Sequence, residues 1–187
     1  TNIRAMIETQ YGILSHMITD IAYRYQTQLK QTEEEADRLA RDNSDGDYEV
    51  YHTILNSFND VEERSYCLMT ESRKILFCAI FSYYETMLNE FVLYYKIANN
   101  ATQPSLILDS ILKAYKIKYG EEITCIEDNV EYANSIYRLL RNLYMHGSLS
   151  KEKDRCTLFN HAGVTHGLKA VGIDTIVITD NAFLYKA

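Results

Sequence analysis

The sequence of 187 residues has few of the residues that interrupt regular structure, with one proline and seven glycines. Because proline and glycine end helices and form the turns between strands, their scarcity favours a few long helices over many short strands. Tryptophan is absent, whereas 16 tyrosines are present, and tyrosine can pack its ring into a core while its hydroxyl stays near water. The chain has the length of one domain and is long enough to bury a core.

Patterns for disulfides, metals and membrane spans are also missing. The four cysteines form no Cys-x-x-Cys pair, so we expect reduced thiols in a cytoplasmic protein rather than a disulfide framework or zinc site. No apolar run reaches the ~20 residues of a membrane span, because Glu85, Asn89 and Glu90 interrupt the longest, residues 75–95. No group of metal ligands has a sensible spacing. The sequence therefore predicts no membrane contact, no metal and no cofactor.

The charge is negative overall and unevenly distributed. A net charge of −7 argues against a protein that binds nucleic acid over its whole surface. Residues 33–49 hold eight acidic side chains against two arginines, which indicates a solvated surface. Residues 138–155 differ, with five basic side chains against two acidic ones. This basic segment is therefore the part of the chain best suited to an anionic ligand.

Apolar residues recur at the three-and-four spacing of amphipathic helices through most of the chain. A turn is expected at residues 43–46, a new helix start at Thr70, and a C-terminal helix cap at Gly147. The predicted helices comprise residues 1–42, 48–69, 70–95, 106–119 and 128–146.

The residues after Gly147 have a different character. Residues 148–160 are polar and basic, which indicates a loop, and residues 174–179 are β-branched and alternating, which is typical of a strand or hairpin arm. Asp180 is a candidate cap for a short last helix. The expected fold is one all-α domain, residues 1–187, an up-and-down bundle of about five helices with a short β-hairpin-like segment. Its parts are a long N-terminal helix (1–42), core helices (48–147), and a loop and strand-like extension (148–187).

The last core helix has chemically versatile side chains near its end. On a helical wheel of ~100° per residue, Arg141, Asn142 and His146 fall away from the apolar side, and Asn142 and His146 are one turn apart. Arginine binds phosphate and histidine moves protons near neutral pH. Three ordinary interpretations stay open: an ion pair for Arg141, a dipole interaction for His146, and solvation for Asn142.

The segment from Arg141 to His146, Arg-Asn-Leu-Tyr-Met-His, resembles the R-N-x-x-x-H signature of HEPN domains (higher eukaryotes and prokaryotes nucleotide-binding). The aromatic-rich run 81–89, which contains Glu85, is similar to the central helix of that family. The resemblance implies a metal-independent endoribonuclease, often a toxin or phage-defence protein, that cleaves RNA by attack of the 2′-hydroxyl. It implies catalytic roles for Arg141, Asn142 and His146, and a homodimer in which two motif helices face each other.

Further side chains are candidates for supporting roles. Arg138, Lys151 and Lys153 are candidates for binding RNA phosphates, although a solvated loop explains the two lysines equally well. Glu85 is expected to fix Arg138 or Arg141 by an ion pair rather than to act in catalysis. A protein antitoxin or inhibitor is a further expected partner.

Two other functions stay open at this point. One is a non-catalytic HEPN module that dimerises or binds a nucleotide or a partner protein. The other is an unrelated helical interaction protein whose first helix fits a partner's groove. A motif face buried inside the protomer would favour this last interpretation.

Overall fold

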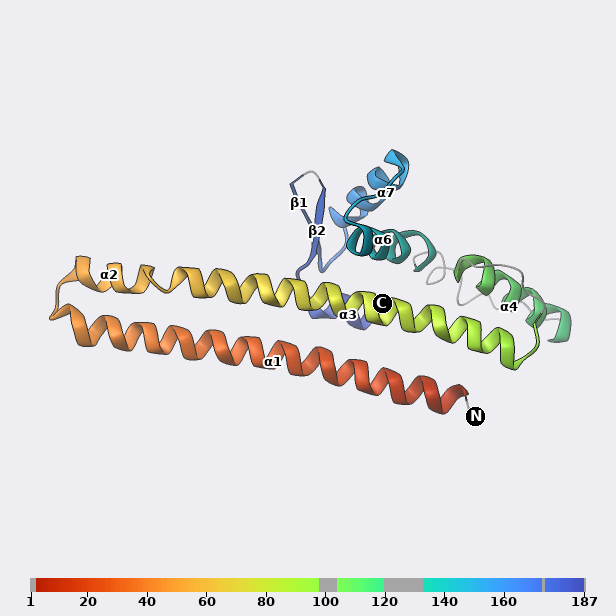
Figure 1. The fold of residues 1–187 in the computed structure, drawn as a ribbon, viewed down its shortest axis with the longest axis horizontal. Coiled ribbons are helices and arrows are strands. Elements are labelled where there is room, and N and C mark those ends of the chain that lie inside the picture. The colour runs from red at the N-terminus through yellow and green to blue at the C-terminus, as the bar shows by residue number, and fades with distance from the viewer. Residues whose placement is uncertain (1–2, 98–103, 120–132, 173, 187) are drawn as a thin grey trace.

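The computed structural model describes residues 3–97, 104–119, 133–172 and 174–186, and the fold is all-α with one short hairpin (Figure 1). Among these residues, no helix is long and apolar enough to cross a membrane. In chain order the elements are α1 (Ile3–Ser44), α2 (Tyr48–Asn56), α3 (Asn59–Tyr94), α4 (Pro104–Tyr119), the π-helical turn η2 (Ala133–Tyr137), α6 (Arg138–His146), α7 (Glu152–Ala162), β1 (Leu168–Val171), β2 (Thr175–Ile178) and α8 (Asn181–Lys186).

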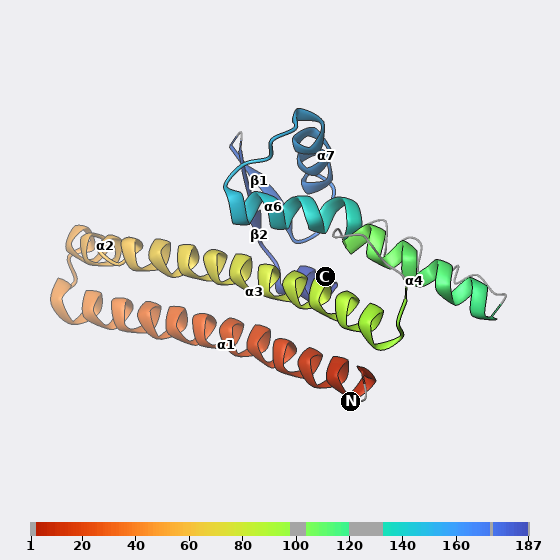
Figure 2. The same cartoon turned by 45° about the vertical axis from the view of Figure 1, so that its right-hand side comes forward.

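Two long helical segments, α1 and α2–α3, lie side by side and run in opposite directions (Figures 1 and 2). The expected turn is present, since Asp45 and Gly46 have φ angles of 47° and 85° that reverse the chain. Asp47 then caps α2, because its carboxylate accepts hydrogen bonds from two backbone N–H groups, at 2.8 and 3.2 Å. The helix predicted to start at Thr70 is wrong: α3 is continuous there, with Thr70 buried inside it. No proline or glycine interrupts residues 59–94, so nothing in the backbone favours a break.

The main core forms where α6 crosses the middle of α3. Phe77 on α3 is fully buried, and its ring lies 5.8 Å from Tyr137, 6.0 Å from Tyr144 and 5.9 Å from Phe183, measured between centroids. Aromatic rings at such separations gain energy beyond the burial of their surface. The core therefore joins α3, the η2–α6 segment and α8, and it fixes the position of the helix that has the motif.

The C-terminal part contains more helix than expected. The predicted loop over residues 148–160 is wrong, because residues 152–162 form α7. Only Leu158 and Ala162 of this helix are buried, so its apolar pattern was too sparse to detect. The predicted strand is present as β2, which pairs antiparallel with β1 in the register Leu168↔Ile178. The expected cap of the last helix is present too, since Ala182 N–H donates to Asp180 Oδ1 at 2.8 Å.

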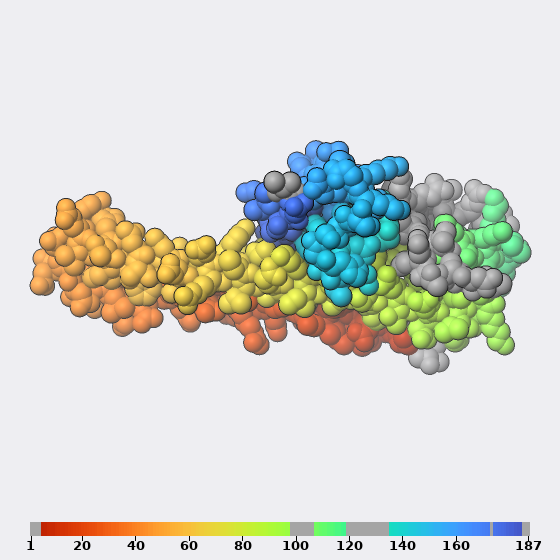
Figure 3. All heavy atoms as spheres, turned by 45° about the horizontal axis from the view of Figure 1, so that its top comes forward, coloured from red at the N-terminus to blue at the C-terminus, as the bar shows by residue number. Residues whose placement is uncertain are grey.

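The elements after α4 all gather around the middle of α3. Figure 3 shows that α6, α7 and the hairpin cover this middle part, whereas α1, α2 and the start of α3 continue past them. These continuing segments form a projecting arm of two helical layers, defined here as residues 24–44 of α1 together with residues 48–72. The fold thus divides into a compact part, which holds the motif, and this two-layered arm.

Candidate functional site

The candidate site is the end of α6, which is held by its buried leucines. Leu140 and Leu143 are buried in the core, so the opposite side of the helix faces outward. Gly147 ends the helix with a φ of 71°, and its N–H donates to the carbonyl of Leu143 at 2.8 Å. That left-handed conformation is the reason that glycine suits this position. The expected outward placement is present, with Arg141 and Asn142 half-buried and His146 exposed.

The Arg141 guanidinium is held between two acceptors. Its Nη1 donates to Asn142 Oδ1 at 3.1 Å, and its Nη2 lies 3.6 Å from Glu85 Oε2 on α3. The ion pair expected for Glu85 is therefore with Arg141. Arg141 Nε is buried and has no hydrogen-bond partner among the described residues. The group is thus oriented by its neighbours, and because Nε is buried, only the second N–H hydrogens of Nη1 and Nη2 are left to meet an anion.

His146 is on the last turn of α6 and is exposed. Within the described ranges its imidazole has no hydrogen bond or ion pair, and Asn142 points its amide oxygen at Arg141 instead. Two groups therefore lie at one helix end, an anchored guanidinium and an accessible imidazole. The helix dipole also favours a cation at this end, so the ordinary interpretation of His146 stays open.

The other predicted phosphate ligands are arranged less tightly. Arg138 is half-buried at the first turn of α6. Lys151 is exposed at the N-cap of α7, just outside the helix, and Lys153 is exposed on the first turn of that helix, so only Lys153 departs from the expected loop. No contact given by the described residues joins these lysines to Arg141. The two lysines have no ion pair within the described part of the chain, and they lie on the segment that follows the motif rather than in one assembled site with Arg141.

Arg155 shows that the basic segment is less positive than its sequence suggests. Its guanidinium lies 3.1 Å from Glu152 and 2.9 Å from Asp174, and these carboxylates raise the pKa of Arg155. Asp174 is 19 residues away in the chain, so the fold brings it into contact. Arg155 is thus committed to structure and is a poor candidate for binding phosphate.

A stripe of α3 under the motif helix was not found from the sequence. The Lys74 ammonium lies 5.7 Å from the centre of the Tyr144 ring. Burial raises the pKa of Cys78, an effect that the nearby Arg141 guanidinium partly offsets. Burial also raises the pKa of Tyr144, whose hydroxyl has no partner in the described part of the chain. Because both groups stay neutral, Cys78 and Tyr144 act as packing residues. In the sequence, only their helical spacing along α3 and α6 pointed to this role.

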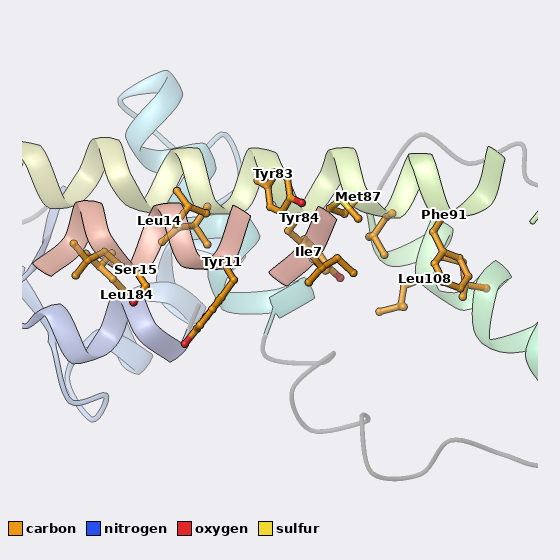
Figure 4. A pocket seen from close by; sticks show the side chains of 14 residues that line it. Ile7, Tyr11, Leu14, Ser15, Tyr83, Tyr84, Met87, Phe91, Leu108 and Leu184 are labelled. Atoms are coloured by element: carbon orange, nitrogen blue, oxygen red, sulfur yellow. The ribbon is translucent and has the colours of Figure 1, made fainter. Parts of the chain in front are cut away.

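An apolar pocket of about 550 Å³ lies on a different side of α3 (Figure 4). Its walls come from α1, α3, α4 and α8, with the hydroxyl-bearing residues Tyr11, Ser15, Tyr83 and Tyr84 among otherwise apolar side chains. It includes none of the motif residues and no acidic or basic side chain. The pocket therefore lacks the groups that acid–base chemistry needs, although its volume is in the range of ligand sites.

No group of three or more His, Cys, Asp or Glu side chains able to hold a metal ion occurs among the described residues. Comparisons of this protein with models of known families, with curated proteins and with solved structures found no match. A functional hypothesis therefore depends on the side chains at the end of α6.

Proposed function

We propose that this protein is a metal-independent RNA endonuclease of the HEPN type, acting as a toxin or defence ribonuclease, with its active site at Arg141, Asn142 and His146. The observation that supports this proposal is the arrangement at the end of α6: Arg141 is oriented by Glu85 and Asn142, and His146 is exposed one helical turn further on. The residue types and their spacing also match the signature described above.

The proposed reaction needs no external nucleophile, because RNA supplies its own 2′-hydroxyl. The bond between the 2′-oxygen and phosphorus forms while the bond between phosphorus and the 5′-oxygen breaks. His146 takes the proton from the 2′-hydroxyl or gives one to the leaving 5′-oxygen. The free N–H groups of Arg141 bind the non-bridging oxygens and stabilise their developing charge. The products are a 2′,3′-cyclic phosphate and a 5′-hydroxyl.

One protomer supplies a single motif histidine, whereas the reaction benefits from both a base and an acid. We therefore propose a homodimer in which a second copy supplies the other. Arg138, Lys151 and Lys153 would bind phosphates on either side of the cleaved bond. Asn142 would act mainly by holding the Arg141 guanidinium, since its amide oxygen accepts from that group. A protein antitoxin or inhibitor is proposed as a further partner, because an unrestrained ribonuclease damages its own cell.

The test is incubation of purified protein with total RNA in EDTA, followed by analysis of the fragment ends. We expect cyclic-phosphate ends, a loss of about 10²- to 10³-fold in Arg141→Ala, and a loss of about 10²- to 10⁴-fold in His146→Ala. Matched controls are Arg24→Ala and His16→Ala, which change exposed side chains on α1 and should cut at the wild-type rate. Full-rate cleavage by both motif variants would remove this site from consideration.

The second candidate function is a non-catalytic HEPN module that binds a nucleotide or a partner protein. The charge favours it, because the protein has a net charge of −7 and Arg155 is neutralised by its neighbours. This function predicts binding that Arg141→Ala weakens, without RNA turnover. The unrelated interaction protein is less well supported, because the motif face is not buried inside the protomer: His146 is exposed.

A further inference from the structure

One face of α3, along the arm and just beyond its end, has aliphatic side chains that the described residues leave partly or largely exposed. Val61, Leu68 and Ile75 are seven residues apart and are 37%, 57% and 69% exposed, respectively. A repeat of seven keeps side chains in line along a helix and is the spacing of a helix–helix seam. The exposure increases towards the compact part of the molecule, so this line is not the frayed end of a helix.

The neighbouring elements contact α3 on either side of this line. Tyr25 on α1 shares a hydrogen bond with Ser72 at 3.3 Å, and the Arg141 guanidinium on α6 is near enough to Cys78 to lower the pKa of that thiol against the effect of burial. On a helical wheel, Ser72 and Cys78 fall about 60° to the two sides of Ile75. On the wheel, the exposed line therefore lies between the positions at which α3 meets α1 and α6.

Oppositely charged side chains beside this line are placed so that they could pair between two copies of the chain. Arg64 is exposed and has no ion-pair partner among the described residues. Glu71 pairs with Lys74 one turn further along α3 but stays 61% exposed on the same face, so its carboxylate can accept a second cation. If a second α3 crosses antiparallel at Leu68, each Val61 meets the other copy's Ile75, and each Arg64 meets the other copy's Glu71. Both the apolar and the charged pairs then form twice, as a twofold-symmetric interface requires. An unrelated helix has no reason to match this arrangement.

We propose that the line of Val61, Leu68 and Ile75 is the contact surface for a second copy of this chain, with α3 packed antiparallel against α3 and the twofold axis at Leu68. The contact depends only on α3 and does not rest on the proposed ribonuclease activity. It assigns a specific surface and register to the dimer.

Charge exchange tests the register in the full-length protein. Light scattering coupled to gel filtration should give the mass of a dimer. Arg64→Glu and Glu71→Arg should each weaken association by about tenfold or more, because each places like charges opposite one another. The double variant Arg64→Glu/Glu71→Arg should restore association to near the wild-type strength. Glu63→Arg, a charge reversal on the same turn but off the line, serves as the matched control and should associate normally.

Cysteine trapping tests the position of the axis. In a background with the four native cysteines replaced by serine, Leu68→Cys should form a disulfide with its own copy on oxidation, since both lie at the axis. Tyr66→Cys, which is exposed on the other side of α3, should stay monomeric on denaturing gels. A monomeric mass throughout the concentration range would overturn the proposal. So would a dimer in which charge exchange fails to restore association, or one trapped by Tyr66→Cys and not by Leu68→Cys. No readout uses RNA, so failure here is separate from failure of the nuclease proposal.

Discussion

The Glu85→Gln substitution removes the negative charge opposite the Arg141 guanidinium and keeps a side chain of nearly the same shape. At the observed separation of 3.6 Å, two unit charges attract by about 5 kcal/mol for an effective dielectric constant of 20. The two side chains are 26% and 29% exposed, so water screens the pair, and holding both side chains costs entropy. The net contribution is therefore at most about 1 kcal/mol. We expect the free energy of unfolding in urea, followed by circular dichroism, to fall by no more than this amount.

The effect on cleavage should be larger than the effect on stability. Without the Glu85 carboxylate, Asn142 alone orients the Arg141 guanidinium, and we expect kcat to fall about tenfold while KM changes little. The pH dependence should keep its shape, because Glu85 neither takes nor gives a proton in the proposed reaction. A stability loss above about 2 kcal/mol would show that Glu85 mainly supports the fold. Wild-type cleavage by Glu85→Gln, beside an inactive Arg141→Ala, would show that the ion pair does not position the guanidinium.

Three further predictions concern the core and are measured by urea unfolding. Arg73→Ala should lower stability by about 2–4 kcal/mol, because this buried side chain donates to α8 at 2.7 Å and to the β2 carbonyl at 3.4 Å; a loss below about 1 kcal/mol would contradict this. Gly167→Ala should lower the free energy of unfolding by about 1–3 kcal/mol more than Gly172→Ala does. Both glycines have a positive φ, but only a Cβ at residue 167 would lie 2.8 Å from Phe183 Cβ. Equal losses in the two variants would refute this steric argument. Tyr144→Phe should change stability by less than about 1 kcal/mol or increase it, since it removes a buried hydroxyl without a partner; a large loss would reveal a hydrogen bond to that hydroxyl.

The helices could be predicted where an apolar stripe or a distinctive residue marks them. The turn at residues 43–46 and the cap at Asp180 were found from residue chemistry that acts locally. α7 was missed because only Leu158 and Ala162 face the core, and two positions make no visible period. The break expected at Thr70 is wrong for a related reason. A threonine can cap a helix, but here its side chain is buried within one, and packing decided between the two.

The site could be predicted only as far as a single helix determines it. The wheel placed Arg141, Asn142 and His146 on the outward side of α6, and the pairing of Glu85 was narrowed to two arginines. Which arginine it meets depends on how α6 crosses α3, and no periodicity within one helix gives that angle. The contact of Arg155 with Asp174 depends in the same way on where the hairpin folds back. The residues of the site were therefore predictable, while their partners across elements were not.

The proposed dimer contact has a consequence for the proposed reaction. Tyr144 packs beside Lys74, six residues from Leu68, so the end of α6 lies about 9 Å along α3 from the proposed axis. An axis perpendicular to the two antiparallel α3 helices keeps both copies of α6 on the same side of the pair. Both sites then lie on the same side of the dimer with the α6 ends about 18 Å apart along α3, too far for the two His146 side chains to act on one phosphate, so each site would take its second proton-transfer group from another residue of the dimer.

If that group comes from the second copy, as the proposed function requires, cleavage depends on the dimer. On dilution, the cleavage rate per protomer should fall as the dimer fraction measured by light scattering falls, and Arg64→Glu should shift both curves to higher concentration together. The double variant Arg64→Glu/Glu71→Arg should return both curves to the wild-type position, which excludes a separate effect of the Arg64 charge on RNA binding. A rate per protomer that stays constant while the dimer dissociates would mean that one protomer holds a complete site. His146 would then need an acid or base from its own chain, and the dimer would have a role other than assembling the active site.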